Sequence, residues 1–283
     1  MTEILICEII CEICGCFSLI NSRSYVLWFR SVQMKTEIIS HIGEHFQEYT
    51  KYQYFIEPSR LSTGAPIPSP EKPVEEKADI LPLSNGDHIL AERNPSLSTI
   101  IKNRRSQRNF KTNAITTEEL SALLWATQGV IESGRGYSLR TAPSAGARHP
   151  LETYLNCVQV DGIAEGLYRY QPLMNKLVQL STGSVIKQLL TSAGLGQHMF
   201  NRCAVSFIWT AVIERSRWKY QQRAFRYIYL DAGHVCQNLY LSSEALGLGC
   251  CAVAAFDDDA VNEIVGVDGK EEFAIYMATV GKI

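Results

Sequence analysis

The stretch AVSFIWTAVI, residues 204–213, decides the fold. It is an almost uninterrupted apolar run rich in β-branched and aromatic residues, which is typical of a strand buried on both faces. The next long segment, residues 224–246, has apolar residues on more than one side of a helix and ends before Gly247, a residue that commonly caps helices. We therefore expect a central strand followed by a helix that lies in the core or in a subunit interface.

Weaker patterns surround this pair. Thr116 and Glu119 form a capping box that begins a helix ending near Gly129. Further strands are predicted over 151–160, 166–170, 176–180, 251–256 and 273–280, the second and third forming a hairpin, with a short helix over 258–265. Strands and helices do not alternate strictly, so the predicted fold class is α+β, with a mixed or antiparallel central sheet surrounded by helices.

The N-terminal third reads differently. Residues 34–49 place apolar side chains at helical spacing, and residues 58–95 contain seven of the ten prolines. Because proline removes backbone donors and interrupts helices, this second stretch is predicted to be an extended arm or linker. The expected organisation is an accessory or mis-assigned extension over 1–33, a helix and proline-rich arm over 34–95, and a compact domain over 96–283.

The extension contains a cysteine cluster, C-x3-C-x2-C-x-C, formed by Cys7, Cys11, Cys14 and Cys16. Thiolates at this spacing could hold irons of a four-iron cluster, and the spacing resembles the radical S-adenosylmethionine pattern. That interpretation requires strand–helix repeats after the cluster, whereas a helix and the proline-rich stretch follow. We expect incidental cysteines and no bound metal, and the absence of a basic leader makes the segment a poor signal peptide.

Composition limits the possible partners. The net charge is −2, with 46% hydrophobic and 20% charged residues, as in soluble globular proteins. Neither nucleic acid nor a membrane is an expected partner. Nine cysteines, an odd number that includes several in apolar segments, indicate a reducing cytoplasm rather than a disulfide framework.

One basic stretch, KNRRSQRNFK at residues 102–111, suggests a bound anion. Arg104, Arg105 and Arg108 bracket Ser106, so that three guanidinium groups and a hydroxyl can converge on a phosphate. Taken alone, the stretch favours a solvated basic surface, and a nucleic-acid tether would need more basic surface than one short run.

Four segments together resemble the flavin-dependent nitroreductase superfamily, and within it the SagB-type dehydrogenases. They are RRSQRNF at 104–110, PSAGARHPLE at 143–152, WKYQQRAFRYIYLDAGHVCQNLYL at 218–241 and GLGCCAVAAFDD at 247–258. The resemblance covers about residues 96–283. It implies FMN bound at the interface of a homodimer with intertwined subunits.

The resemblance also implies which residues bind the cofactor. Arg104, Ser106 and Arg108, assisted by Arg105, would hold the phosphate and ribityl chain, and Lys282 is a candidate for the same phosphate. The turn Pro143-Ser144-Ala145-Gly146 would approach the flavin from the partner subunit. The strand reaching Ala254 and Ala255, where relatives often have glycines, would donate backbone hydrogen bonds to the ring. For each of these groups the alternative is an ordinary loop or a solvated side chain.

Lys219 and Tyr220 are the residues that could take part in bond making. In SagB-type dehydrogenases, a Lys-Tyr pair at this place is implicated in removing the substrate proton while hydride passes to flavin N5. A lysine acts as a base only where burial or nearby cations favour its neutral form, and Arg215, Arg217 and Arg223 are such cations. The alternative is a surface pair at the start of a helix.

These residues predict an FMN-dependent oxidoreductase that acts on a small organic molecule or a peptide heterocycle, with NAD(P)H as an optional electron donor. The alternative is a non-catalytic FMN-binding scaffold subunit of a peptide-modifying complex, because fold similarity does not establish activity.

Overall fold

A computed structural model describes residues 40–283, which form two compact units dividing after Tyr54. The described part of the first unit consists of helix α3 (Ile42–Tyr49) and a 3-10 turn, η1 (Tyr52–Tyr54). The helix predicted over 34–49 is confirmed over the span of α3. The predictions for residues 1–33, including the cysteine cluster, lie outside the described residues.

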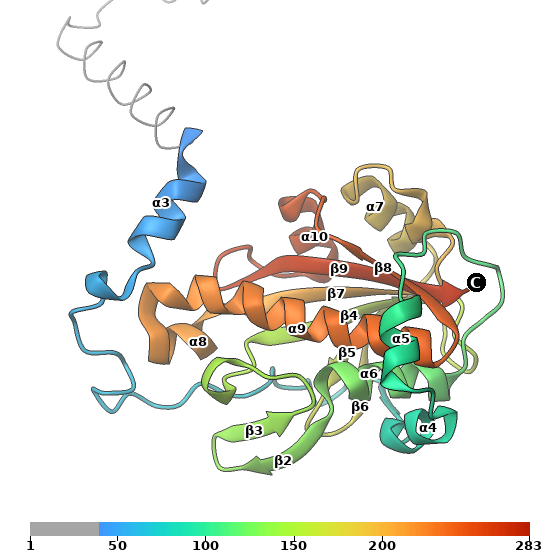
Figure 1. The fold of residues 1–283 in the computed structure, drawn as a ribbon, viewed down its shortest axis with the longest axis horizontal. Helices are drawn as coiled ribbons and strands as arrows, with labels where there is room; N and C mark the ends of the chain where they lie inside the picture. Colours follow the sequence, from blue (N-terminus) through green and yellow to red (C-terminus); the bar gives the residue numbers. More distant parts are fainter. Residues whose placement is uncertain (1–39) are drawn as a thin grey trace, which may run out of the picture. The chain divides into compact units, whose positions relative to one another are not determined.

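The second unit is built on a seven-stranded antiparallel sheet with the strand order β1-β6-β5-β4-β7-β9-β8 (Figure 1). Its strands are β1 (Ile80–Pro82), β4 (Leu151–Cys157), β5 (Gly166–Gln171), β6 (Lys176–Thr182), β7 (Val205–Val212), β8 (Leu248–Val253) and β9 (Glu272–Lys282). A separate hairpin joins β2 (Val130–Gly134) to β3 (Tyr137–Arg140). The predicted strand at 204–213 is therefore central, as β7.

Helices cover both faces of the sheet. They are α4 (Gly86–Arg93), α5 (Leu97–Asn103), α6 (Thr117–Gln128), α7 (Val185–Ala193), α8 (Ile213–Tyr220), α9 (Ala224–Ala245) and α10 (Asp258–Val265), with 3-10 turns η2 (Ala145–Ala147), η3 (His198–Asn201) and η4 (Gln221–Arg223). In the view of Figure 1, α9 crosses in front of the sheet. The predicted α+β class is confirmed.

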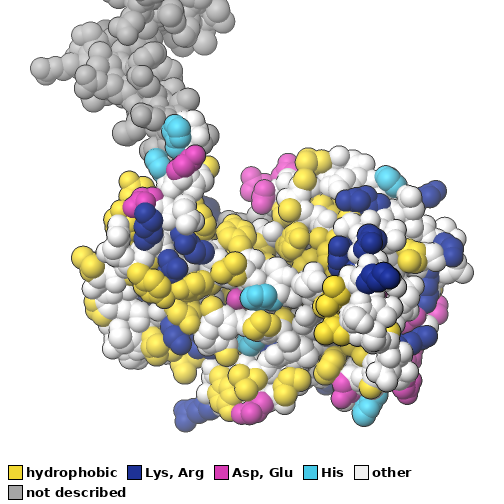
Figure 2. All heavy atoms as spheres, viewed as in Figure 1, with side chains coloured by type: hydrophobic (Ala, Val, Ile, Leu, Met, Phe, Trp, Pro, Cys, Tyr) yellow, Lys and Arg dark blue, Asp and Glu magenta, His cyan; other side chains and the backbone are white. Residues whose placement is uncertain are grey.

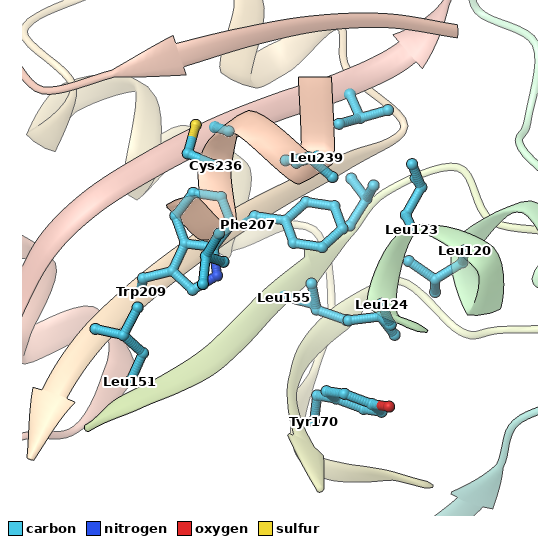
Figure 3. Packing of buried hydrophobic residues seen from close by; sticks show 14 of the residues in the cluster. Leu120, Leu123, Leu124, Leu151, Leu155, Tyr170, Phe207, Trp209, Cys236 and Leu239 are labelled. Carbon is cyan, nitrogen blue, oxygen red and sulfur yellow. The ribbon is translucent and has the colours of Figure 1, made fainter. Parts of the chain in front are cut away.

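The larger apolar core lies between one face of the sheet and the pair α6 and α9. In the view of Figure 3, Leu239 of α9 lies near Phe207 of β7, Cys236 of α9 lies near Trp209, and the labelled leucines of α6 lie on the side of Phe207 away from Trp209. Both aromatic side chains are fully buried. On the opposite face, α7 and α10 form a second core against Tyr154 and Ile208. Burial on both faces explains why β7 has a continuous apolar sequence.

The structure confirms the predictions that rest on residues close together in the sequence. The Thr116–Glu119 capping box is present at the start of α6, and Gly129 follows the helix. The hairpin β5–β6 pairs as predicted. Strand β8 begins three residues earlier than the predicted start at 251, whereas α7, α8 and the β2–β3 hairpin were not predicted.

The proline-rich stretch is not the plain extended arm that its composition predicted, because it contains β1 and α4. Residues 70–73 of the stretch are held by buried side chains of β3 and β5, which donate hydrogen bonds to their backbone carbonyl groups. Arg140 donates to Pro70, Gln171 to Lys72 and Arg169 to Pro73, over 2.6–3.1 Å. Proline retains its carbonyl acceptor, so these side chains can hold the stretch although it lacks ladder donors.

Candidate active site

The turn Pro143–Gly146 is held from below by Asp231 of α9. The Asp231 carboxylate accepts hydrogen bonds from Ser144 Oγ at 2.6 Å and from the Ala145 N–H at 3.2 Å. Ser144 Oγ also accepts the N–H of His149 at 2.9 Å. Asp231 is almost fully buried, and burial raises the pKa of its carboxyl group.

Lys219 and Tyr220, at the end of α8, lie against this turn. A Cβ atom built on Gly146 would be 2.5 Å from Tyr220 Oη and 3.0 Å from Lys219 Nζ. Gly146 also has φ +61°, a conformation that side chains other than glycine rarely adopt. The glycine therefore leaves room for the ammonium and phenol groups at the surface of the turn. The fold brings together two segments that the sequence proposed separately.

The arginines predicted to act on Lys219 have other partners. Arg215 forms a fully buried ion pair with Glu152. Arg217 pairs with Glu214 and Glu271. The charges of Arg215 and Arg217 are compensated by carboxylates, whereas Arg223 donates from Nε to the Tyr227 hydroxyl at 2.8 Å.

The basic segment after α5 is organised by Tyr240 of α9. The Tyr240 hydroxyl accepts the Ala252 N–H at 2.8 Å and shares a hydrogen bond with Ser106 Oγ at 2.9 Å. Arg104 lies over its ring, with Cζ 5.2 Å from the centroid. Tyr240 thus joins the basic segment to β8, a role that no local pattern in the sequence signalled.

The three guanidinium groups differ in orientation. Arg105 turns back onto the carbonyl groups of Lys102 and Arg104. Arg108 is exposed, and its hydrogen bond is a long 3.5 Å contact to the Ser106 carbonyl. None of the three forms an ion pair with a described residue. Figure 2 shows Lys and Arg side chains gathered near α5, on the right of the view. Arg104 and Arg108 are the groups that can accept an anionic ligand.

Lys282 has a different neighbour. Its ammonium group contacts both carboxylate oxygens of the buried Glu119, at 2.6 and 2.8 Å. The backbone carbonyl of Lys282 accepts the N–H of Lys111. Ser106, in contrast, forms a parallel β-bridge with Cys250. Within one subunit the amine is therefore engaged by Glu119 and is not grouped with Arg104 and Arg108.

Ala254 and Ala255 follow the last residue of β8 and are both exposed. No hydrogen bond within the described residues uses either backbone N–H group. The Ala255 carbonyl accepts a hydrogen bond from Gln197. Two donors at the end of a strand are thus available to a ligand.

The two groups of residues lie at different positions along α9. Asp231 anchors the turn and Tyr240 anchors the basic segment, and their separation of nine positions corresponds to about 13 Å along a helix. The turn and the basic segment are therefore anchored at two different points of α9.

A small hollow lies beneath the turn, lined among others by Gln128, His149, Asp231 and Val235. His149 is buried, and its Nε2 is 2.9 Å from the Ser138 carbonyl. Burial, together with the charge of Arg140, lowers the pKa of His149 to about 3. His149 is therefore neutral at physiological pH and stabilises the turn.

Over residues 40–283, no three His, Cys, Asp or Glu side chains are grouped so as to hold a metal ion. In the same part of the chain, no helix combines the length and apolar character needed to cross a bilayer.

Comparison with known proteins identifies the domain. Residues 101–282 match the model of the nitroreductase family. A protein of Methanocaldococcus jannaschii named as a nitroreductase, MJ1384, is 37% identical over 66% of this chain and 90% of its own length. The trifolitoxin-processing protein TfxB of Rhizobium leguminosarum bv. trifolii is 30% identical over 50% of this chain, but over 39% of its own length. A crystal structure of an Anabaena variabilis protein described as a nitroreductase has a TM-score of 0.61 and 27% identity, covering 73% of this chain and 42% of that one.

Proposed function

Because the chain belongs to the nitroreductase family of oxidoreductases, we propose that it is an FMN-dependent enzyme that works as a homodimer. The proposal is carried by the position of Lys219 and Tyr220 against the Gly146 turn. Bound FMN would supply a ring position, N5, that accepts or donates hydride.

The residues present fit this cofactor. Arg104 and Arg108 are cations without a described carboxylate partner, and Ser106 lies between them. We assign the phosphate to these three residues, with Arg105 beside them. The N–H groups of Ala254 and Ala255 are available to acceptor atoms of a flat ring. Lys282 is left out of the assignment, since Glu119 binds its amine.

The separation along α9 supports the homodimer. A second copy related by a two-fold axis would place its Pro143–Gly146 turn beside the basic segment of the first copy. Leu97 and Ile101 of α5 and Leu230 of α9 are each more than half exposed, and these two helices contact one another. An apolar face of this kind supports a subunit contact.

Lys219 is proposed to take the proton from the substrate, with Tyr220 orienting or relaying it. The identity to a trifolitoxin-processing protein supports a SagB-type dehydrogenase that acts on a heterocycle in a modified peptide. A small quinone or nitroaromatic compound reduced with NAD(P)H is the other substrate class. The unpaired buried thiols, among them Cys157 and Cys203, support a cytoplasmic location.

An absorption spectrum of the freshly purified protein tests the cofactor. Flavin bands between about 300 and 500 nm, retained on gel filtration at the mass of a dimer, are expected. Protein that stays colourless after incubation with FMN would contradict the proposal.

Replacing Lys219 with Ala separates an enzyme from a scaffold subunit. An enzyme loses turnover while retaining FMN, whereas a scaffold supports its complex unchanged. Lys187→Ala is the matched control, because Lys187 lies on α7, away from the turn, where it pairs with Glu165.

A further inference from the structure

The helix that carries the proposed catalytic pair is short and ends in an unusual conformation. Helix α8 has eight residues and is followed by Gln221, whose φ of +52° and ψ of −138° are normally adopted by glycine. A non-glycine residue held in this conformation requires support from its surroundings. The strained residue directly follows Lys219 and Tyr220.

Support comes from residues 57–69, which we call the strap. The Gln221 side chain donates to the Glu57 carbonyl at 2.6 Å. Trp218 is bound twice, since its carbonyl accepts the Leu61 N–H and its indole Nε1 donates to the Ala65 carbonyl, both at 3.0 Å.

Two ionic side chains extend these contacts along α8. Arg60 pairs with Glu214 in the first turn of the helix. Arg215 Nε donates to the Ser69 carbonyl at 2.8 Å, and its Nη1 contacts the His149 carbonyl at 3.4 Å. The strap therefore contacts α8 from its first turn to the residue after its end.

Trp218 also links the strap to the turn. Arg148 lies over the indole ring, with Cζ 5.2 Å from the centroid, and both side chains are buried. Arg148 is two residues after Gly146. The indole of Trp218 thus contacts the strap through its Nε1 and contacts Arg148, next to the Gly146 turn, through its ring face.

We propose that Trp218 and Gln221 are positioning residues, through which the strap holds Lys219 and Tyr220 against Gly146. The match to the family model begins at residue 101, so the strap lies outside the matched residues. The inference rests on the proposed function for its catalytic meaning, whereas the placement of Lys219 can be measured separately.

Two variants test the proposal. Trp218→Phe removes the indole donor to Ala65 but keeps an aromatic ring beside Arg148. Gln221→Ala removes the bond to Glu57 at a partly exposed position and keeps the strained backbone. Trp125→Phe is the control, because no described hydrogen bond uses the indole nitrogen of Trp125.

The first measurement is the rate at which an amine-reactive acylating reagent modifies Lys219, determined by peptide mass spectrometry with Lys187 as internal reference. Trp218→Phe and Gln221→Ala should each raise the rate of Lys219 modification about five-fold, the factor equivalent to losing one hydrogen bond of roughly 1 kcal/mol. Circular dichroism and thermal unfolding identify the folded variants. An unchanged Lys219 rate in folded Gln221→Ala overturns the proposal.

The second measurement separates this proposal from the proposed function. With the FMN dissociation constant unchanged, kcat should fall in Trp218→Phe and in Gln221→Ala and remain unchanged in Trp125→Phe. A fall in FMN affinity that parallels the fall in kcat would overturn a positioning role. If Lys219→Ala retained full turnover, the proposed function would fail, and the modification rates would still decide whether the strap places Lys219.

Discussion

The phenol of Tyr240 offers a sharp test of the cofactor site. Its hydroxyl joins Ser106 to Ala252, while its ring supports Arg104. Tyr240→Phe removes two hydrogen bonds and keeps the ring. At about 0.5–1.5 kcal/mol for each net hydrogen bond, the free energy of unfolding should fall by about 1–3 kcal/mol.

The same change should weaken FMN binding. Without the hydroxyl, the basic segment is no longer fixed to β8, so part of the binding free energy is spent on ordering it. A loss of about 1.4 kcal/mol raises the dissociation constant about ten-fold. Urea unfolding gives the stability of the apoprotein, and quenching of FMN fluorescence gives the dissociation constant.

Tyr168→Phe is the matched control. Its hydroxyl donates to the Ala164 carbonyl at 2.8 Å, and its ring is fully buried in the core. This variant should lose about 0.5–1.5 kcal/mol of stability while binding FMN normally. The reasoning is refuted if Tyr240→Phe binds FMN as tightly as the unmodified protein, or if Tyr168→Phe weakens binding equally.

Three further changes have defined outcomes. Gly146→Ala places a methyl group against Lys219 and Tyr220, the proposed catalytic pair, in a left-handed conformation, so kcat should drop while thermal unfolding reports a loss of about 1–2 kcal/mol. Lys282→Met leaves the carboxylate of Glu119 without its cation, so urea unfolding should show a loss of about 1–3 kcal/mol with FMN affinity unchanged. The pKa of His149 is lowered to about 3, so below its ordinary value of 6.5 the unfolded chain binds a proton that the native protein does not. Stability should therefore fall by up to about 2 kcal/mol between pH 6.5 and 5, and His149→Asn should flatten this dependence in urea titrations.

The sequence predicts the parts of the fold that are determined by residues close together along the chain. The Thr116 side chain caps a helix three residues away, and the apolar run of β7 reports its own burial. The position of the Lys219–Tyr220 pair beside the 143–146 turn could not be read from either segment. It depends on α8, a polar helix whose sequence gives little amphipathic signal.

The remaining features arise from contacts between distant residues. Lys282 binds Glu119 across 163 positions, and Arg215 binds the Ser69 carbonyl across 146. Sequence periodicity does not predict such pairs, because the two residues come together only when the sheet has formed. For this reason the proline-rich stretch appeared to be a simple arm, although its carbonyl groups are recognised by buried side chains.

The order of strands in the sheet has a consequence for biosynthesis. Strand β9, residues 272–282, lies between β7 and β8, both of which emerge earlier from the ribosome. Until β9 is synthesised, the inner edges of those two strands have no partner for their backbone hydrogen bonds. The nascent chain must therefore keep two apolar strands apart from other polypeptides, and a holdase chaperone should bind it most strongly in that interval.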